Sequence, residues 1–198
     1  MTHSQDGQDE FVINHLNKMR NGYFLDIGAS DGVLYSNTYR LETEYEWSGL
    51  MVECDPPTVD SLRKNRKSII DTRPVWSKTG EEIKFKSVEL GKLSGIESNL
   101  SHPKALKRPG KTLHLTTVSL DDLLQQHDCP MHINYFSLDV EGSEFDILTT
   151  YSFRHTFDVI TVEHLKNKDE ITSLLKSKGY TVAQIIMKDQ ETIFVRNP

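Results

Sequence analysis

The chain has 198 residues, of which 36% are hydrophobic, and a formal net charge of −6 at pH 7. This length suits one domain with a sizeable core, so residues 1–198 are interpreted as a single domain. The acidic balance argues against binding of nucleic acid through bulk charge. No apolar run is long enough to span a membrane and no signal peptide is visible, so we expect a cytoplasmic protein.

Short apolar runs alternate with amphipathic stretches from Gly22 onward, which is typical of β-α units on a mostly parallel sheet. The first two predicted strands are 23–28 and 49–54, and residues 73–77 are the end of the third. The fourth and fifth are 133–140 and 157–164. The predicted helices are 37–45, 58–67, 120–127 and 143–150. A further helix, ended by Gly179, precedes a hairpin of strands 180–187 and 191–196, which we expect to be antiparallel. These elements predict an α/β fold with helices on both faces of the sheet.

Residues 80–117 interrupt this pattern and are interpreted as a surface hairpin with a long loop, or as a lid. A solvated face is the default interpretation of the basic residues of this segment and of those at 63–67. The first cluster could instead recruit an anionic acceptor, or a nucleic acid. Its members are Lys104, Lys107, Arg108 and Lys111.

The stretch "DIGASDG" ends the first predicted strand at Asp26 and turns through Gly28 and Gly32. Glycines at such a turn let the backbone approach a ligand closely. A carboxylate at the position of the first glycine of the GxGxxG pattern disfavours a pyrophosphate, and with it a nicotinamide-dependent oxidoreductase. A nucleoside with a cationic amino-acid part, as in S-adenosylmethionine, fits better.

The second predicted strand ends near Glu53, where a carboxylate can accept hydrogen bonds from both hydroxyls of a ribose. Asp26 and Glu53 would then lie on either side of one nucleoside. The alternative is structural: Asp26 would cap the turn, and Glu53 would be a solvated strand end.

Several motifs together resemble the FkbM-type methyltransferase family, and part of the pattern is closest to its Star-like branch. They are "SQDGQD", "FLDIGASDG", "SNTYRLE", "WSGLMVECDP", "LRKNRK", "VSLDDLL" and "FSLDVEGSEFDIL". The resemblance implies a Rossmann-like class I methyltransferase fold with a seven-stranded sheet. It also implies S-adenosylmethionine-dependent O-methylation, with sugar or polyketide hydroxyls as acceptors. A non-catalytic interaction module of the same fold is the alternative.

The resemblance also implies donor-binding residues. The loop around the methionine and ribose parts would be formed by Asp26, Gly28, Ala29 and Gly32, and the ribose hydroxyls would bind Glu53. Further contacts are implied for Ser36, Asn37, Asp55, Pro56, Trp76 and Ser77. A packing role for Trp76 and a helix-capping role for Ser36 and Asn37 stay open.

Chemistry is expected at the carboxyl ends of the fourth and fifth predicted strands. Asp139 is the candidate that contacts the donor or orients the acceptor, and His164, beside Glu163, is the candidate base. His164 could equally be an ordinary strand-end histidine. Glu144 is interpreted as a charge at the start of a helix, without a catalytic role.

The same acids suggest a site for a divalent cation such as Mg²⁺, held by Asp139, Glu141 and Glu163 together with His164. A third mechanism uses a Lys-Asp-Lys-Glu tetrad, as in enzymes that methylate the ribose 2'-hydroxyl of RNA. Lys18, Lys166 and Glu191 would complete it with Asp139, but the fit is loose. The expected acceptor is therefore a hydroxyl of a glycan or small molecule, with RNA less favoured.

Overall fold

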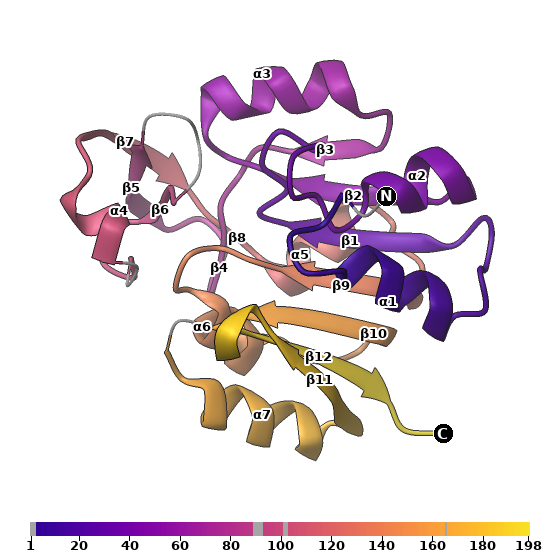
Figure 1. Cartoon of the computed structure of the whole chain (residues 1–198). Helices are drawn as coiled ribbons and strands as arrows, with labels where there is room; N and C mark the ends of the chain where they lie inside the picture. The colour runs from indigo at the N-terminus through magenta and orange to yellow at the C-terminus, as the bar shows by residue number, and fades with distance from the viewer. Residues whose placement is uncertain (1–2, 89–92, 101–102, 165) are drawn as a thin grey trace.

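The computed structural model describes residues 3–88, 93–100, 103–164 and 166–198. In this part of the chain, seven strands form one sheet (Figure 1). In spatial order they are β3 (Ile69–Asp71), β2 (Ser48–Val52), β1 (Tyr23–Ile27), β9 (His132–Leu138), β10 (Thr156–Glu163), β12 (Glu191–Arg196) and β11 (Tyr180–Ile186).

The strands from β3 to β10 run parallel, and β12 is antiparallel to both of its neighbours, β10 and β11. The predicted fold is therefore confirmed: a mostly parallel seven-stranded sheet with an antiparallel strand from a C-terminal hairpin. The 3₁₀ turn Met187–Asp189 connects β11 to β12.

Helices cover both faces of this sheet. One face packs against α1 (Gln8–His15), α2 (Tyr39–Tyr45) and α3 (Pro56–Asn65). The other packs against α5 (Leu120–Gln126), α6 (Glu144–Thr150) and α7 (Lys168–Ser177). Successive side chains of a strand point to opposite faces, and in β1 Phe24 and Leu25 enter different cores, each with 0% exposure. This explains why the strands are apolar at nearly every position.

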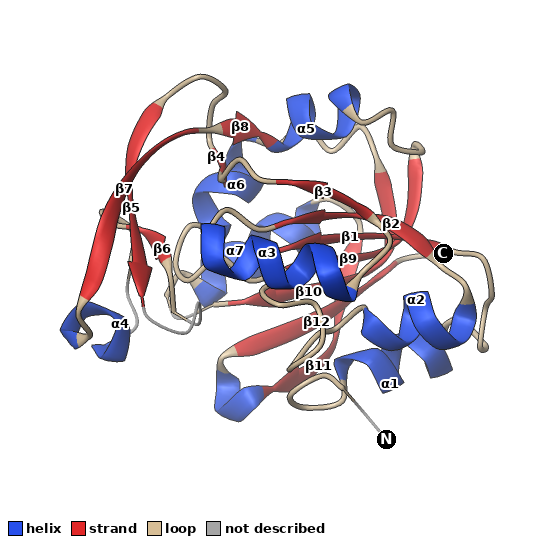
Figure 2. Cartoon of the chain, turned by 90° about the horizontal axis from the view of Figure 1, so that it is seen from above, coloured by secondary structure: helices blue, strands red, loops and turns tan. Residues whose placement is uncertain are grey.

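Two small sheets lie beside the main one. β4 (Val75–Trp76) pairs with β8 (Val118–Ser119), and β5 (Glu82–Val88) lies between β6 (Gly95–Ile96) and β7 (Gly110–Thr116). The short helix α4 (Pro103–Lys107) follows β6. Figures 1 and 2 show the three-stranded sheet standing to one side of the main sheet, beyond the carboxyl ends of its strands.

The prediction that the third strand ends at 73–77 is wrong. The third strand of the main sheet is β3, which ends at Asp71, and residues 75 and 76 belong to the separate pair β4–β8. Pro74 explains the difference, because a proline has no N–H to donate to a sheet. Its carbonyl oxygen instead accepts a hydrogen bond from the backbone N–H of Val118 at 3.0 Å.

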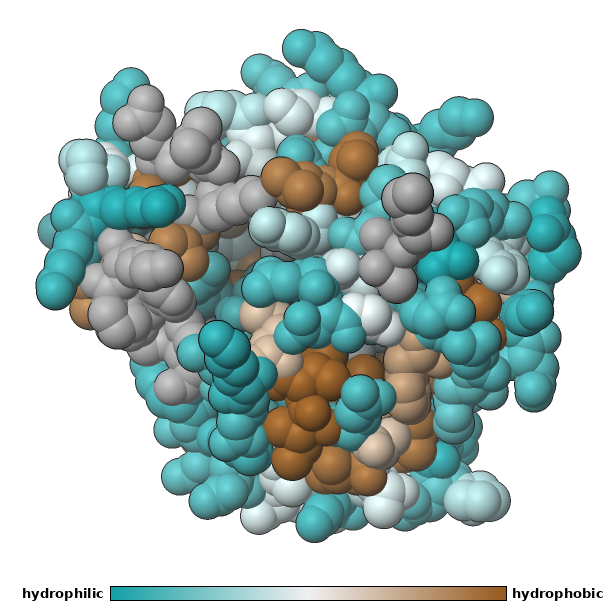
Figure 3. All heavy atoms as spheres, in the orientation of Figure 1, coloured by the Kyte–Doolittle hydropathy of each residue, from teal (hydrophilic) through white to brown (hydrophobic). Residues whose placement is uncertain are grey.

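The surface in the orientation of Figure 1 is largely hydrophilic, with one hydrophobic group over the C-terminal strands and another in the upper middle of the view (Figure 3). Ile185 of β11 is 47% exposed. Among the residues that the structure describes, no helix has the length and apolar character that a membrane span needs.

Candidate active site

A cavity of about 300 Å³ opens where β1, β2, β9 and β10 end. Ligands of open α/β sheets bind at this edge, and the volume is within the range of small-molecule sites. Among the described residues its lining contains no lysine or arginine. Its acidic members are Asp26, Glu53, Asp139, Glu141, Glu163 and Glu191.

The loop after β1 is attached to the end of β2. The N–H groups of Gly28 and Ala29 both donate to the carbonyl oxygen of Val52 at 3.0 Å, and that of Ser30 donates to Oε2 of Glu53 at 3.0 Å. A pyrophosphate at such a turn needs free backbone N–H groups, and these three are already used. The loop therefore suits a ligand with hydroxyl groups and positive charge better than a dinucleotide.

Gly28 permits a close approach of the ends of β1 and β9. Its φ is +90°, and a Cβ atom there would lie 1.6 Å from the carbonyl oxygen of Asp139. The N–H of Asp139 in turn donates to the carbonyl oxygen of Ile27 at 3.0 Å. Only glycine fits this position, and the contact sets Asp139 directly beside the loop.

Asp26 and Asn37 line the cavity from the two ends of the loop. The carboxylate of Asp26 accepts a hydrogen bond from the Thr38 hydroxyl at Oδ2, at 2.6 Å, and burial raises its pKa to about 6. Asn37 donates from Nδ2 to the Ser137 hydroxyl at 3.0 Å. Among the described residues, Oδ1 of Asn37 has no hydrogen-bond partner, so it can accept one from a ligand.

Glu53 lines the cavity at the end of β2 and is 9% exposed. Burial raises its pKa to about 7. Its Oε1 accepts the backbone N–H of Asp55 at 2.8 Å, and lone pairs of both oxygens remain for hydroxyl donors. Asp55 lies outside the lining, because its carboxylate accepts the hydroxyls of Ser87 at 2.6 Å and Ser94 at 3.3 Å.

Trp76 and Ser77, predicted to flank an adenine ring, also lie outside the lining. The indole N–H of Trp76 is directed at Oδ2 of Asp146, 3.5 Å away. The apolar surface beside Glu53 comes instead from residues that the sequence reasoning missed, Phe85 of β5 and Ile96 of β6. The sequence signal for Phe85 is the strand-like alternation within residues 82–88, whereas Ile96 lies in a strand of two residues, which has no such pattern.

Gly32 and Ser36 belong to the same loop but do not line the cavity. Both contact the buried side chain of Arg66, which donates from Nη1 to the carbonyl oxygen of Gly32 at 3.0 Å and to the Ser36 hydroxyl at 3.2 Å. Of the predicted donor-binding residues, the cavity thus brings together Asp26, Gly28, Ala29, Asn37, Glu53 and Asp139.

Asp139, Glu141 and Glu163 form an acidic cluster at the ends of β9 and β10. One carboxylate oxygen from each lies within 4.8 Å of the others. Burial raises the pKa of all three, and the carboxyl groups of Asp139 and Glu163 share a hydrogen bond. Oxygen ligands at this spacing fit a hard divalent cation. Within the described residues, neither Oε2 of Glu141 nor Oε2 of Glu163 has a hydrogen-bond donor as partner.

His164 does not join this cluster. It directly follows Glu163, so its side chain points to the opposite face of the sheet. There it is 3% exposed, and its Nε2 lies 2.7 Å from the Thr192 hydroxyl. Burial lowers its pKa. Glu144, also outside the lining, accepts hydrogen bonds from the N–H groups of Val140 at 3.0 Å and Gly142 at 3.1 Å, so it stabilises the turn before α6.

The side of the cavity nearest Glu163 is formed by Glu191, which the sequence suggested only for the RNA tetrad, and by three glutamines that the sequence reasoning did not assign to the site. Glu191 begins β12 and is the pairing partner of Glu163 in β10. Gln8, at the start of α1, donates from Nε2 to Oε2 of Glu191 at 2.6 Å. Gln5 and Gln190 also line this side. We call these four residues the amide wall. Contacts between the two chain ends leave no local signal in the sequence.

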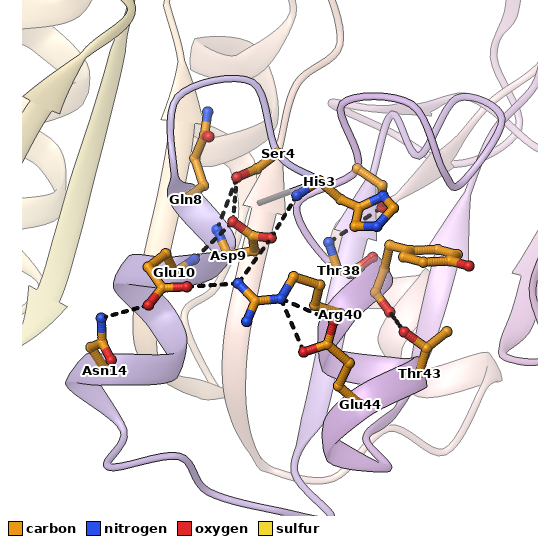
Figure 4. A network of polar contacts seen from close by, with 12 residues as sticks. His3, Ser4, Gln8, Asp9, Glu10, Asn14, Thr38, Arg40, Thr43 and Glu44 are labelled. Carbon is orange, nitrogen blue, oxygen red and sulfur yellow. Dashed lines mark hydrogen bonds and ion pairs between the residues drawn. The ribbon is translucent and has the colours of Figure 1, made fainter. Parts of the chain in front are cut away.

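The N-terminal part of the amide wall is fixed to α2, as Figure 4 shows. Asp9 accepts the Ser4 hydroxyl at 2.5 Å, and Arg40 of α2 lies 3.7 Å from Asp9 and 2.7 Å from Glu10. Arg40 also pairs with Glu44 at 3.1 Å. Residues 3–10 therefore have a defined position beside the cavity.

Comparison with known protein families gives one match. The model of the methyltransferase FkbM domain matches residues 26–182. No curated protein matches the chain. The matched region holds Asp26, Glu53, Asp139 and Glu163, whereas every residue of the amide wall lies outside it.

Solved structures similar to the chain include several methyltransferases. Precorrin-6y C5,15-methyltransferase from Geobacter metallireducens has 12% identity and a TM-score of 0.49, over 96% of this chain and 88% of that one. Ribosomal protein L11 methylase from Lactobacillus delbrueckii subsp. bulgaricus has 11% identity and a TM-score of 0.47, over 96% and 77%. TrmK of M. capricolum, in complex with S-adenosyl-homocysteine, has 12% identity and a TM-score of 0.45, over 93% and 66%.

Proposed function

Because the chain belongs to the FkbM methyltransferase family, we propose that it transfers the methyl group of S-adenosylmethionine to a hydroxyl of a sugar or another hydroxyl-bearing small molecule. The observation that carries this proposal is the pair of acids at the ends of adjacent parallel strands, Asp26 and Glu53, which line one cavity together with Asp139.

The donor would bind over β1 and β2. Glu53 would accept the ribose hydroxyls, Asp26 would face the cationic part of the methionine, and Oδ1 of Asn37 would accept from its ammonium group. Phe85 and Ile96 would cover the adenine. The bonding of the loop N–H groups to β2 supports this arrangement over a dinucleotide.

The acceptor hydroxyl would lie over β9 and β10. Its oxygen attacks the methyl carbon in line with the sulfur, the C–O bond forms as the C–S bond breaks, and the hydroxyl proton passes to Asp139. The products are a methyl ether and S-adenosylhomocysteine. Protonated Glu163 would hold the Asp139 carboxylate by a hydrogen bond, as a positioning group.

The acidic cluster also fits a divalent cation such as Mg²⁺, held by Asp139, Glu141 and Glu163. A bound cation would lower the pKa of the acceptor hydroxyl. In that case, transfer requires the metal, and chelation abolishes it.

Charge supports an acceptor without phosphate. An anion entering the cavity would meet acids and the amide wall, and no lysine or arginine among the described lining residues. Lys107, Arg108 and Lys111 are exposed elsewhere, and the side chain of Lys104 lies outside the described residues. Neither Lys18 nor Lys166 lines the cavity, which leaves the RNA tetrad without its lysines there.

The test is transfer of labelled methyl from S-adenosylmethionine to three acceptor pools: neutral oligosaccharides, phosphorylated sugars and RNA. We expect label in the neutral pool, as an ether stable to base, and none with Asp139→Asn. Label that appears only in RNA or only in phosphorylated sugars would overturn the proposed acceptor class.

A further inference from the structure

The guanidinium group of Arg66, at the end of α3, is buried beneath the donor loop and its side chain has 0% exposure. Its Nε donates to Glu42, and its Nη1 donates to Gly32 and Ser36 as described above. Its Nη2 donates to the carbonyl oxygen of Thr38 at 3.2 Å and to the Thr38 hydroxyl at 3.1 Å. Every N–H of the group therefore has an acceptor.

The contact with Thr38 fixes the direction of a second hydrogen bond. Arg66 can only donate, so the Thr38 hydroxyl accepts from it and directs its own proton elsewhere. That proton points at Oδ2 of Asp26, 2.6 Å away. Thr38 is 0% exposed, so solvent does not compete for the hydroxyl. The result is a chain of donors from Arg66 through Thr38 to Asp26.

The packing around Arg66 also explains why residue 32 is a glycine. A Cβ atom at Gly32 would lie 2.6 Å from Cγ of Arg66 and 2.5 Å from Cδ1 of Leu62. The packing of Arg66 and Leu62 and a φ of +75° thus favour glycine here. The hydrogen bonds to Gly32 and Thr38 hold two points of the loop on one rigid group. Neither Arg66 nor Thr38 lines the cavity.

We propose that Arg66 and Thr38 are positioning residues of the donor site: through the Thr38 hydroxyl, Arg66 holds the Asp26 carboxylate toward the cationic part of the methyl donor. This rests on the proposed function, because the donor is S-adenosylmethionine. Buried, charge-assisted hydrogen bonds of this kind are stronger than neutral ones and fix orientation.

Thr38→Val tests the chain of donors, because valine keeps the branched shape and removes the hydroxyl. Its matched control is Thr38→Ser, which keeps the hydroxyl. Calorimetric titration with S-adenosylmethionine should show an affinity about tenfold lower in Thr38→Val, the loss expected for one charged hydrogen bond. Thr38→Ser should restore most of that loss, which a purely structural role of the β-branched side chain would not predict.

A double-mutant cycle separates positioning from packing. If Thr38 acts through Asp26, Thr38→Val should weaken donor binding in the wild-type background and have little further effect in Asp26→Asn. Should Thr38→Val not fold, Arg66→Lys, which keeps the charge but loses the planar fork, is carried through the same cycle.

Two outcomes distinguish the claims. A wild-type chain that binds no S-adenosylmethionine overturns the proposed function and this assignment with it. If the wild-type chain binds S-adenosylmethionine, two results overturn the positioning role alone. The first is a folded Thr38→Val that binds the donor as well as the wild type does. The second is a Thr38→Val substitution that costs as much donor affinity in the Asp26→Asn background as in the wild type.

Discussion

Asp26 and Glu53 end neighbouring strands, yet their carboxylates are held in different ways. Glu53 accepts two backbone N–H groups, whereas Asp26 accepts one buried hydroxyl. The sequence predicted both residues because their position follows from short-range order: an apolar strand, then an acid, then a turn. It also placed Glu163 and His164 together at one edge, although strand alternation separates them.

The first prediction concerns Glu53. Burial raises its pKa to about 7, and only the ionised form accepts freely from two ribose hydroxyls. Donor affinity should therefore rise with pH between about pH 6 and 8 in the wild type, in line with this value. Glu53→Gln should bind the donor about tenfold more weakly and lose that rise. Calorimetric titration across this range decides, and an unchanged affinity in Glu53→Gln would contradict the ribose contact.

The second prediction concerns Asp139. Asp139→Asn keeps the shape but removes the proton acceptor, so methyl transfer should fall by about 100-fold or more. Donor affinity should stay near the wild-type value. Asp146→Asn makes the same charge change outside the cavity and should retain activity. Equal turnover of wild type and Asp139→Asn would remove Asp139 from the chemistry.

At the scale of the elements, the central strands of the sheet could be predicted from the sequence, whereas β3 and the amide wall could not. The central strands could be predicted because both of their faces are buried, which makes them apolar throughout. β3 could not be predicted, because only its three residues, Ile69–Asp71, pair with β2, and the apolar residues after Pro74 form another sheet. The amide wall was equally hidden, since its contacts join residues 183 positions apart.

The third prediction concerns the contact between the β1 loop and β9. In Gly28→Ala the new Cβ would collide with the carbonyl oxygen of Asp139, so the free energy of unfolding should fall by about 3 kcal/mol or more. Gly80→Ala is the control, because its φ is +82° but nothing lies within 4 Å of the added atom. Gly80→Ala should lower the free energy of unfolding by only about 1 to 2 kcal/mol. Similar urea midpoints for both variants would contradict the close approach.

For the whole molecule, the gathering of acids at one edge predicts how stability depends on pH. Burial raises the pKa of Asp26 to about 6 and of Glu53, Glu144 and Glu191 to about 7. An acid whose folded-state pKa is raised binds more protons in the folded state, so its contribution is complete below the unfolded pKa and is lost as pH rises through the folded one.

The fourth prediction follows from that sign. The melting temperature of the chain without ligand should fall between about pH 5 and pH 8. Burial lowers the pKa of His155 and His164, which act in the opposite sense but are fewer. S-adenosylmethionine brings positive charge to the same edge, so its stabilising effect should grow over this range. Thermal melts at fixed ionic strength measure both, and a melting temperature that rises with pH would contradict the prediction.

The central claim is that the cavity at the ends of β1 and β2 binds S-adenosylmethionine, and calorimetric titration of the purified chain tests it most directly. S-adenosylmethionine and S-adenosylhomocysteine, each with and without Mg²⁺, should bind with micromolar affinity, and NAD should not bind. Binding of NAD, or of none of the three, would contradict the account.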